Sequence, residues 1–322
     1  APHFDWQGYQ PPKPSFIGTR VFSSYDLAEL VPYIDWTPFF QTWDLKGRYP
    51  MLLEEGEQSA AARQVFADAQ EMLTRLVEEQ WFQPKAVLGF WPAQAIGDDI
   101  ALYVGESRQE ERVRLHGLRQ QRGKREGQSH ECLSDFIAPF GGPADYIGGF
   151  VVTIGEAEDK IAQRFARAND DYASIMVKAL ADRLAEAFAE RLHERVRREF
   201  WGYAADERFT PTELLQEPYR GIRPAPGYPA QPDHTEKAIL FDLLQAQKRI
   251  GVRLTESYAM WPGASVSGLY FSHPEAYYFG VSKIERDQVE DYASRKAMTI
   301  GEVGRWLAPI LNYTPTTIVS AA

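Results

Sequence analysis

The sequence has one cysteine and no long hydrophobic run. Because Cys132 stands alone among 322 residues, the chain can form neither an internal disulfide nor a cysteine-rich zinc site. No stretch of about 18 apolar residues is present, so we expect no membrane-spanning helix. A single thiol is also typical of a reducing compartment, and we therefore expect a cytoplasmic protein.

Histidine is also scarce. The chain has six histidines, and no two of them lie three or four residues apart on an expected helix, the spacing that places two imidazoles on one face. We therefore expect no metal site. The histidines are His3, His116, His130, His193, His234 and His273.

Common motifs of catalysis and nucleotide binding are missing. No glycine-rich fingerprint follows an expected strand and opens a helix, and no phosphate loop occurs. Ser265 and Ser267 come near the serine elbow of hydrolases, but no helix is expected after them. The sequence thus predicts no catalytic residue of its own and disfavours a self-contained hydrolase.

The overall composition is that of an ordinary folded protein. Hydrophobic residues make up 44% of the chain and charged residues 25%, which allows a core of useful size. The 35 basic and 45 acidic residues give a net charge of −10. An acidic balance disfavours binding to phosphate backbones, so we expect no nucleic-acid partner.

Apolar periodicity predicts a mixture of helices and strands. Residues 170–201 carry the strongest helical pattern, with an apolar residue every four positions and neither glycine nor proline. Turn residues at 97–99 separate two short apolar runs, which favours an antiparallel pair and hence an α+β fold with a mainly antiparallel sheet. Helices are expected at 24–30, 60–80, 170–201, 235–251, 287–296 and 299–307, and strands at 86–91, 100–103, 147–154, 265–271 and 277–284.

The N-terminal segment is rich in proline. Residues 10–14 read QPPKP, a stiff sequence that enters neither a helix nor a central strand. The chain begins with neither methionine nor a signal-peptide pattern, which suggests a piece of a longer protein. We expect residues 1–20 to be an interdomain linker from an upstream module, order to begin near Val21, and residues 21–322 to form one domain.

Residues 221–229 are the most unusual stretch. Three prolines and two glycines fix the backbone in one irregular path that begins at Arg223. Such a loop offers backbone groups to a ligand at little entropic cost, and an arginine can bind a carboxylate with two hydrogen bonds. The alternative is a rigid surface loop with a solvated arginine.

Three carboxylates have two interpretations each. Asp35 lies among aromatic and aliphatic residues, so it is either a helix N-cap or a carboxylate in an apolar pocket. Glu186 projects away from the apolar stripe of its helix, as a solvent-exposed residue also would. Glu217 precedes Pro218 and is otherwise a loop carboxylate.

Two further stretches have an ordinary and a functional interpretation. In an extended segment, Tyr277 and Phe279 share one face while Tyr278 lies on the other, as core residues also would. Residues 108–125 hold seven basic residues against Glu110 and Glu111. That run is either a solvated helix face or a surface that docks an acidic protein.

Four blocks in this order resemble the C-terminal activation domain of cobalamin-dependent methionine synthase. They are DWTPFF at 35–40, KALADRLAEA at 178–187, RPAPGY at 223–228 and MWPGASVSG at 260–268. The resemblance runs from about residue 21 to residue 307, and DWQGY at 5–9 is similar to the link from the family's cobalamin-binding module. It implies a single helmet-like α+β domain around a twisted antiparallel sheet.

The resemblance also implies a ligand and a task. The family binds S-adenosylmethionine and uses it in the reductive methylation that reactivates cob(II)alamin, within an enzyme that makes methionine from homocysteine and methyltetrahydrofolate. Cobalamin is bound by the neighbouring module, and flavodoxin or an equivalent reductase provides the electron. The isolated domain is a fragment of a methyltransferase and is not expected to turn over alone.

The family's ligand contacts map onto particular residues of this chain. Phe279 stands where a tyrosine is expected, so the resemblance implies a ring or backbone contact there. The implied ligand-binding residues are Asp35, Arg223, Tyr278, Phe279, Glu186, Glu217 and Tyr228. The alternative hypothesis is a docking module that holds the cobalamin domain and the reductase without a small-molecule ligand of its own.

Overall fold

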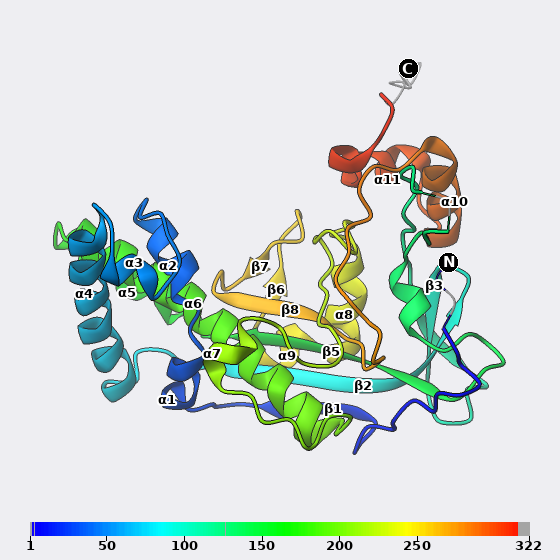
Figure 1. The fold of residues 1–322 in the computed structure, drawn as a ribbon, viewed down its shortest axis with the longest axis horizontal. Coiled ribbons are helices and arrows are strands. Elements are labelled where there is room, and N and C mark those ends of the chain that lie inside the picture. Colours follow the sequence, from blue (N-terminus) through cyan, green and yellow to red (C-terminus); the bar gives the residue numbers. More distant parts are fainter. Residues whose placement is uncertain (1, 3, 126, 315–322) are drawn as a thin grey trace.

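A six-stranded antiparallel sheet runs through the middle of the molecule in Figure 1. The computed structural model describes residues 2, 4–125 and 127–314. The order is β4-β3-β2-β5-β8, and β1 pairs with β2 on the edge that β3 also uses. The strands are β1 (Gly18–Phe22), β2 (Lys85–Ile96), β3 (Asp99–Tyr103), β4 (Glu111–Leu115), β5 (Asp145–Thr153) and β8 (Ser265–Tyr270), and β6 (Arg253–Leu254) and β7 (Met260–Trp261) form a separate pair.

Strand β2 is twice as long as its sequence pattern predicts, although it contains Pro92. Its residues 86–90 pair with β1 and its residues 93–96 pair with β3. Pro92 lies between the two pairings, where no ladder on that edge requires its missing N–H. One long strand therefore holds both halves of the sheet together.

The first face of the sheet is covered by the long helix α6 (Asp171–Arg195), and the N-terminal helices extend this layer by packing on α6 and on one another. Leu88 and Phe90 of β2 pack into this layer, while Val87 and Trp91 lie in the cluster of the other face, as the two-residue period of a strand requires. The remaining helices of this layer are α1 (Leu27–Leu30), α2 (Trp36–Thr42), α3 (Met51–Glu54), α4 (Ser59–Glu78) and α5 (Ala157–Arg167).

The second face is covered by α8 (Glu236–Leu244) and α9 (Ala246–Ile250). The sequence predicts one helix over 235–251, but Gln245 has a left-handed φ of 50°, and the helix breaks there. The break brings both Leu240 and Ile250 onto the sheet, because the two short helices follow its twist.

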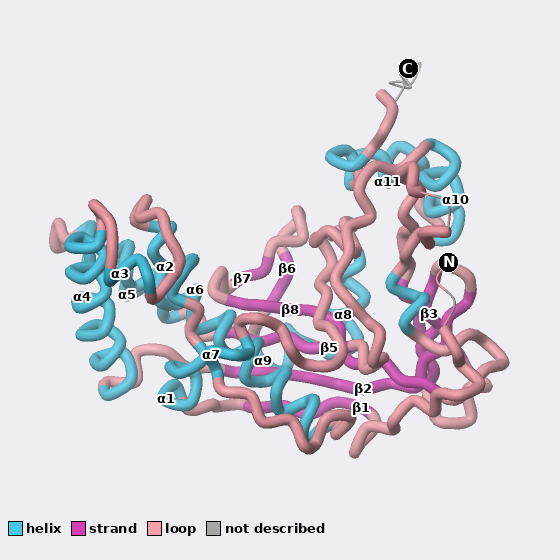
Figure 2. The backbone as a smooth tube through the Cα atoms, viewed as in Figure 1, coloured by secondary structure: helices cyan, strands magenta, loops and turns pink. Residues whose placement is uncertain are grey.

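The C-terminal helices form a third cluster at one end of the molecule, opposite the end where α2 to α5 gather (Figure 2). Helix α10 (Arg286–Lys296) and helix α11 (Ile300–Trp306) pack around the buried Tyr292 and Val281. Thr299 and Glu302 form the reciprocal N-terminal capping box that the sequence predicts for the second of them. Short helical segments elsewhere are η1 (Val31–Tyr33), η2 (Leu133–Phe136), α7 (Pro211–Leu214) and η4 (Ala308–Ile310).

Two further expectations about secondary structure, a strand at 277–284 and a helix face as one interpretation of 108–125, do not hold. No strand is present at 277–284. The Val281 N–H donates to the Pro229 carbonyl at 2.8 Å, but a proline nitrogen has no hydrogen to donate in return, and Ile284 forms only an isolated bridge with Leu311. Residues 108–125 form strand β4 and a loop, and no helix. Four of the seven basic side chains in that run are ion-paired within the domain, namely Arg108, Arg114, Arg119 and Lys124.

The N-terminal segment lies on the domain well before Val21. The Trp201 indole donates to the Pro12 carbonyl at 2.8 Å, and β1 begins at Gly18. Order therefore begins earlier than the sequence predicts. Residues 9–14 carry neither helix nor strand, as their prolines require. The role of residues 1–20 as a linker stays a prediction.

Candidate ligand-binding site

The loop 221–229 is fastened to the edge strand β8. Ile222 exchanges two backbone hydrogen bonds with Phe271, at 3.1 and 3.0 Å, and the Leu269 N–H donates to the Pro224 carbonyl at 2.8 Å. Gly268 makes this approach possible, since a Cβ there would lie 3.0 Å from the Pro224 carbonyl oxygen and 2.9 Å from the Phe150 ring. The loop is thus an irregular extension of the sheet.

The tip of the loop turns at Gly227. Its φ of +92° is in the left-handed region, and a Cβ there would lie 2.4 Å from the His234 ring. The Gly227 N–H donates to the Gln231 carbonyl at 2.7 Å. The turn leaves Tyr228 62% exposed at the mouth of the site.

Two adjoining cavities flank this loop, and Glu186 and Arg223 line both of them. The larger has a volume of about 520 Å³ and lies between the loop, β8 and the segment that contains Tyr278. The smaller has a volume of about 160 Å³ and lies between α6, α7 and the start of α2. Together they bring in all seven residues that the sequence singles out: Asp35, Glu186 and Glu217 with Arg223 at the smaller cavity, and Tyr228, Tyr278 and Phe279 at the larger.

Arg223 lies where the two cavities meet, and its side chain is 18% exposed. Burial by itself lowers the pKa of the guanidinium, but the Glu190 carboxylate, followed by Tyr219 and Tyr278, more than offsets this and raises the pKa above its usual value. Nη1 lies 2.7 Å from Glu190 Oε2. Arg223 is therefore a fixed, permanently charged group and not a solvated surface arginine.

Asp35 is the N-cap of α2. Its Oδ1 accepts a hydrogen bond from the Thr37 N–H at 3.0 Å. Oδ2 has no hydrogen-bond partner among the described residues, and Asp35 lines the smaller cavity. Both interpretations of Asp35 are therefore compatible, because the cap uses one oxygen and leaves the other for a ligand cation.

Glu186 and Glu217 approach the smaller cavity from opposite sides. Glu186 is half-buried on α6, so it is less exposed than a solvent-facing position would be. Glu217 is exposed and has a φ of 51°, a strained value for a residue with a Cβ. With Asp35 and Glu190 they place four carboxylates around Arg223, a distribution suited to a ligand that carries both positive and negative groups.

The alternation predicted for residues 277–279 holds without a strand. The rings of Tyr277 and Phe279 both pack on Phe136, with centroids 5.6 and 6.2 Å away. Tyr278 turns the other way, and its hydroxyl accepts a hydrogen bond from the Arg223 N–H at 3.0 Å. Burial raises the pKa of Tyr278, so it stays a neutral phenol that can still donate its proton.

The far wall of the larger cavity contains Lys237 and His234. Lys237 Nζ lies 3.0 Å from His234 Nδ1 and donates to the Tyr258 carbonyl at 3.0 Å. Burial lowers the pKa of Lys237, and burial together with Lys237 lowers the pKa of His234. The two nitrogens thus lie together in the far wall of the larger cavity, where burial disfavours the charged form of each.

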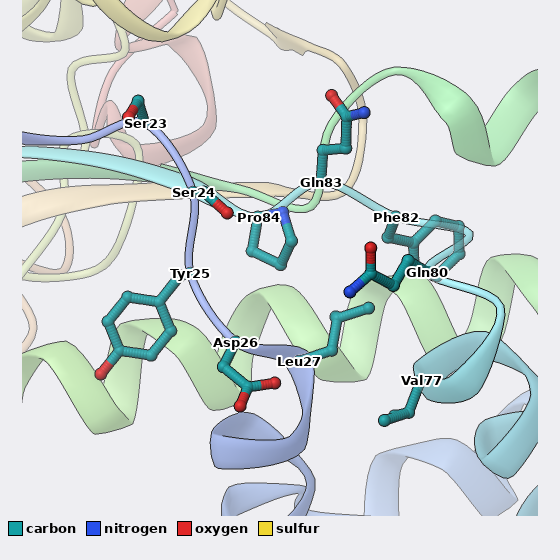
Figure 3. Close-up of a pocket in the computed structure, with 10 residues that line it drawn as sticks. All are labelled: Ser23, Ser24, Tyr25, Asp26, Leu27, Val77, Gln80, Phe82, Gln83 and Pro84. Atoms are coloured by element: carbon teal, nitrogen blue, oxygen red, sulfur yellow. The ribbon is translucent and has the colours of Figure 1, made fainter.

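A separate cavity of about 560 Å³ lies away from this site (Figure 3). It is lined by residues 23–27 and by residues from Val77 to Pro84, none of which the sequence singles out. The one ionised group on it, Asp26, uses Oδ1 to cap α1. We place the candidate site at Arg223, where fixed charges and aromatic rings converge.

Sequence reasoning missed the residues that hold the site from behind. Glu190, His193 and Tyr219 surround Arg223 Nη1, and none was singled out. Glu190 follows Glu186 by four residues on α6, and that spacing on one helical face was the available signal. Tyr219 lies in an irregular segment, so no periodicity marks it.

Within residues 2, 4–125 and 127–314, no group of three histidine, cysteine or carboxylate side chains is arranged to hold a metal ion. Over the same residues, no helix combines the length and the apolar composition that a membrane crossing requires.

Comparisons with known proteins agree on one family. Residues 26–297 match the family described as "Vitamin B12 dependent methionine synthase, activation domain". A crystal structure of the MetH reactivation domain bound to AdoHcy is 54% identical in sequence, superposes with a TM-score of 0.94, and matches 97% of this chain and 96% of its own. This likeness confirms the α+β, mainly antiparallel fold. The chain belongs to the family of activation domains of vitamin B12 dependent methionine synthase.

Proposed function

We propose that this activation domain binds S-adenosylmethionine across the two adjoining cavities and presents its methyl group to the cobalamin of a neighbouring module. The observation that carries the proposal is the convergence of Asp35, Arg223 and Tyr278 on one site. The 54% identical reactivation domain that binds AdoHcy, the demethylated form of this ligand, supports it further.

The ligand's charges match those of the site. Its carboxylate suits the Nε and Nη2 edge of Arg223, which has no partner among the described residues. Its ammonium suits the free oxygen of Asp35. Its sulfonium suits a setting of carboxylates and aromatic faces, which Glu186, Glu217 and the Tyr278 ring provide. Tyr228 and Phe279 enclose the larger cavity.

The domain's part in the reaction is positioning and electrostatics. Cobalamin, when held by its own module, supplies the cobalt nucleophile that accepts the methyl group. The thioether product leaves uncharged, so no side chain of this domain has to move a proton. Glu186 and Glu217 stabilise the sulfonium until its methyl group is transferred. The sulfur is uncharged after transfer, so this attraction is lost and release of the product is favoured.

The remaining assignments follow from the same proposal. Residues 1–20 link the domain to an upstream cobalamin-binding module, and residues 21–322 form the ligand-binding domain. A flavodoxin or an equivalent reductase delivers the electron, and the isolated chain does not turn over alone. The buried thiol of Cys132, whose pKa burial raises to about 12, suits a cytoplasmic protein because it stays unreactive there.

The alternative, a docking module without its own ligand, finds less support. The docking hypothesis rested on the basic run at 108–125. In the structure, Arg119 is paired with both Asp98 and Asp135, and Lys124 is paired with Glu131. Side chains neutralised inside the domain contribute little to the capture of an acidic partner.

A reconstitution assay tests the proposal. The chain is mixed with a separately produced cobalamin-binding module, a chemical reductant and S-adenosylmethionine carrying a labelled methyl group. We expect label on cobalamin only when both proteins are present, and no methionine from the chain alone with homocysteine. Equal labelling without the chain, or methionine made by the chain alone, would overturn the proposal.

A further inference from the structure

Arg223 is held from behind at a single atom. Nη1 lies 2.7 Å from Glu190 Oε2, donates to the Tyr219 hydroxyl at 2.9 Å, and lies 3.3 Å from His193 Nδ1. The other two guanidinium nitrogens make no hydrogen bond with any described residue. The buried end of the guanidinium group is thus fixed at Nη1, while the edge formed by Nε and Nη2 stays available on the cavity side.

Of the three groups at Nη1, only Glu190 is charged opposite to Arg223. Burial, followed by the charges of Arg197 and Arg223, lowers the pKa of His193 well below its usual value, so the imidazole is neutral. Burial raises the pKa of the Tyr219 phenol, which is also neutral. The electrostatic hold on the guanidinium therefore comes from Glu190.

A second arginine lies near Glu190, at a distance too long for a hydrogen bond. The Glu190 side chain is 8% exposed, and its Oε1 lies 3.8 Å from Nη1 of Arg197, a residue with no exposed surface. Arg197 binds Glu207, with contacts of 2.7 to 3.0 Å. The charges thus alternate in sign from the site into the interior, in the order Arg223, Glu190, Arg197 and Glu207.

The helix geometry changes where this row of charges passes. After α6 the chain continues as a π-helical turn, Val196–Phe200, which contains Arg197. Such turns occur often at functional sites because they shift side chains out of α-helical register. Five polar side-chain atoms are buried here without a hydrogen-bond partner among the described residues. They are Glu190 Oε1, His193 Nε2, Arg197 Nη1, Tyr203 Oη and Tyr270 Oη. This region therefore combines a row of buried charges with unpaired polar atoms directly behind Arg223.

We propose that Glu190 is a positioning residue for the ligand's carboxylate and acts through Arg223 without touching the ligand. The inference rests on the proposed function. A guanidinium whose plane is already fixed loses less freedom when it binds a carboxylate with two hydrogen bonds, and Glu190 holds it at the one nitrogen that the ligand does not need.

The test uses Glu190→Gln and two ligands. Glutamine keeps the length of the side chain but removes the charge, so the guanidinium loses its fixed plane. We expect the Kd for S-adenosylmethionine to rise at least about tenfold. For decarboxylated S-adenosylmethionine, which keeps the sulfonium and the amine, we expect a change of less than about twofold. Equal weakening for both ligands, or none for either, would overturn the positioning role.

Asp99→Asn is the matched control. Asp99 is also a buried carboxylate paired with an arginine, Arg295, but it makes no contact with the Arg223 cluster. This substitution should lower the stability of the protein without changing the Kd for one ligand more than the Kd for the other. If Glu190→Gln does not fold, Tyr219→Phe takes its place: loss of one acceptor at Nη1 should weaken S-adenosylmethionine binding about twofold or more and leave the decarboxylated ligand unaffected.

The two proposals fail in different ways. A parent protein that binds neither ligand would contradict the proposed function. A parent that binds S-adenosylmethionine, with variants that bind it equally well, would contradict the role of Glu190 alone.

Discussion

The Tyr278 hydroxyl accepts a hydrogen bond from the backbone N–H of Arg223 at 3.0 Å. This contact ties the segment after β8 to the proline-rich loop 221–229 at Arg223, so the aromatic wall of the site is attached to the arginine that it flanks. Tyr278 is 41% exposed, so the ring is also free to contact a ligand. One wall of the site is thus formed by Tyr278, which lies 55 positions after Arg223 in the sequence.

Tyr278→Phe should weaken ligand binding modestly. The ring remains, but the Arg223 N–H loses its acceptor, and any donation from the phenol to the ligand is lost as well. We expect a loss of about 1 kcal/mol in binding free energy, the usual scale of one hydrogen bond. Isothermal titration measures it, and Tyr277→Phe, on the opposite side of the segment, is the control that should bind like the parent.

Arg223→Lys separates charge from geometry. Lysine keeps the pairing with Glu190 but cannot form the planar fork, so we expect a folded protein with binding weakened by about 1–3 kcal/mol. Arg223→Ala should weaken binding by about 2–4 kcal/mol. It should also destabilise the fold by about 3–5 kcal/mol, because Glu190 is left buried without its partner. Parent-like affinity in folded Arg223→Ala would contradict the carboxylate assignment.

Asp35→Asn tests the two uses of that side chain. Asparagine caps a helix nearly as well as aspartate, so thermal stability should be retained. The charge facing the ligand's ammonium is lost, and the amide places donors there, so the Kd should rise about tenfold. A variant with both stability and affinity of the parent would leave Asp35 as a cap alone.

Glu158 makes stability depend on pH. Burial first, and then Asp182, raise the pKa of this α5 carboxyl to about 7. An unfolded glutamate titrates near about 4.3, so between these values the folded state holds a proton that the unfolded chain has lost. Stability from this group therefore falls as pH rises through that window.

Glu158→Gln removes this penalty. The variant's free energy of unfolding relative to the parent should increase between pH 5 and pH 8, measured by urea denaturation. Glu71→Gln, which removes an exposed carboxyl group on α4 that does not act on Glu158, should show a much smaller change. A relative stability of Glu158→Gln that is the same at both pH values would show that Glu158 titrates normally.

The regular elements were the easiest to predict from the sequence. The apolar period of α6 and the capping box of α11 are local signals, and both helices lie where those signals place them. The π-helical turn at 196–200 carries the same apolar period as an α-helix, so residues 170–201 were predicted as one continuous α-helix. The turn contains Arg197, whose partner Glu207 lies beyond the helix and gives no periodic signal.

The site was predictable in part. Arg223 lies in a loop whose prolines and glycines mark it as preorganised, and the family resemblance singled out six further residues. Of the residues behind Arg223, only Glu190 had a signal in the sequence, its four-residue spacing from Glu186 on α6. Tyr219 and Arg197 come to it through tertiary packing, which no local pattern marks. The strand predicted at 277–284 failed for a similar reason, since the identity of its neighbour decided it.

The most direct test of the account is a calorimetric titration of the isolated chain with S-adenosylmethionine, followed by competition with S-adenosylhomocysteine. We predict saturable binding at one site, displaced by the competitor and weakened in both Arg223→Lys and Asp35→Asn. Absence of saturable binding by the folded chain, or binding that neither substitution alters, would contradict the assignment of this site.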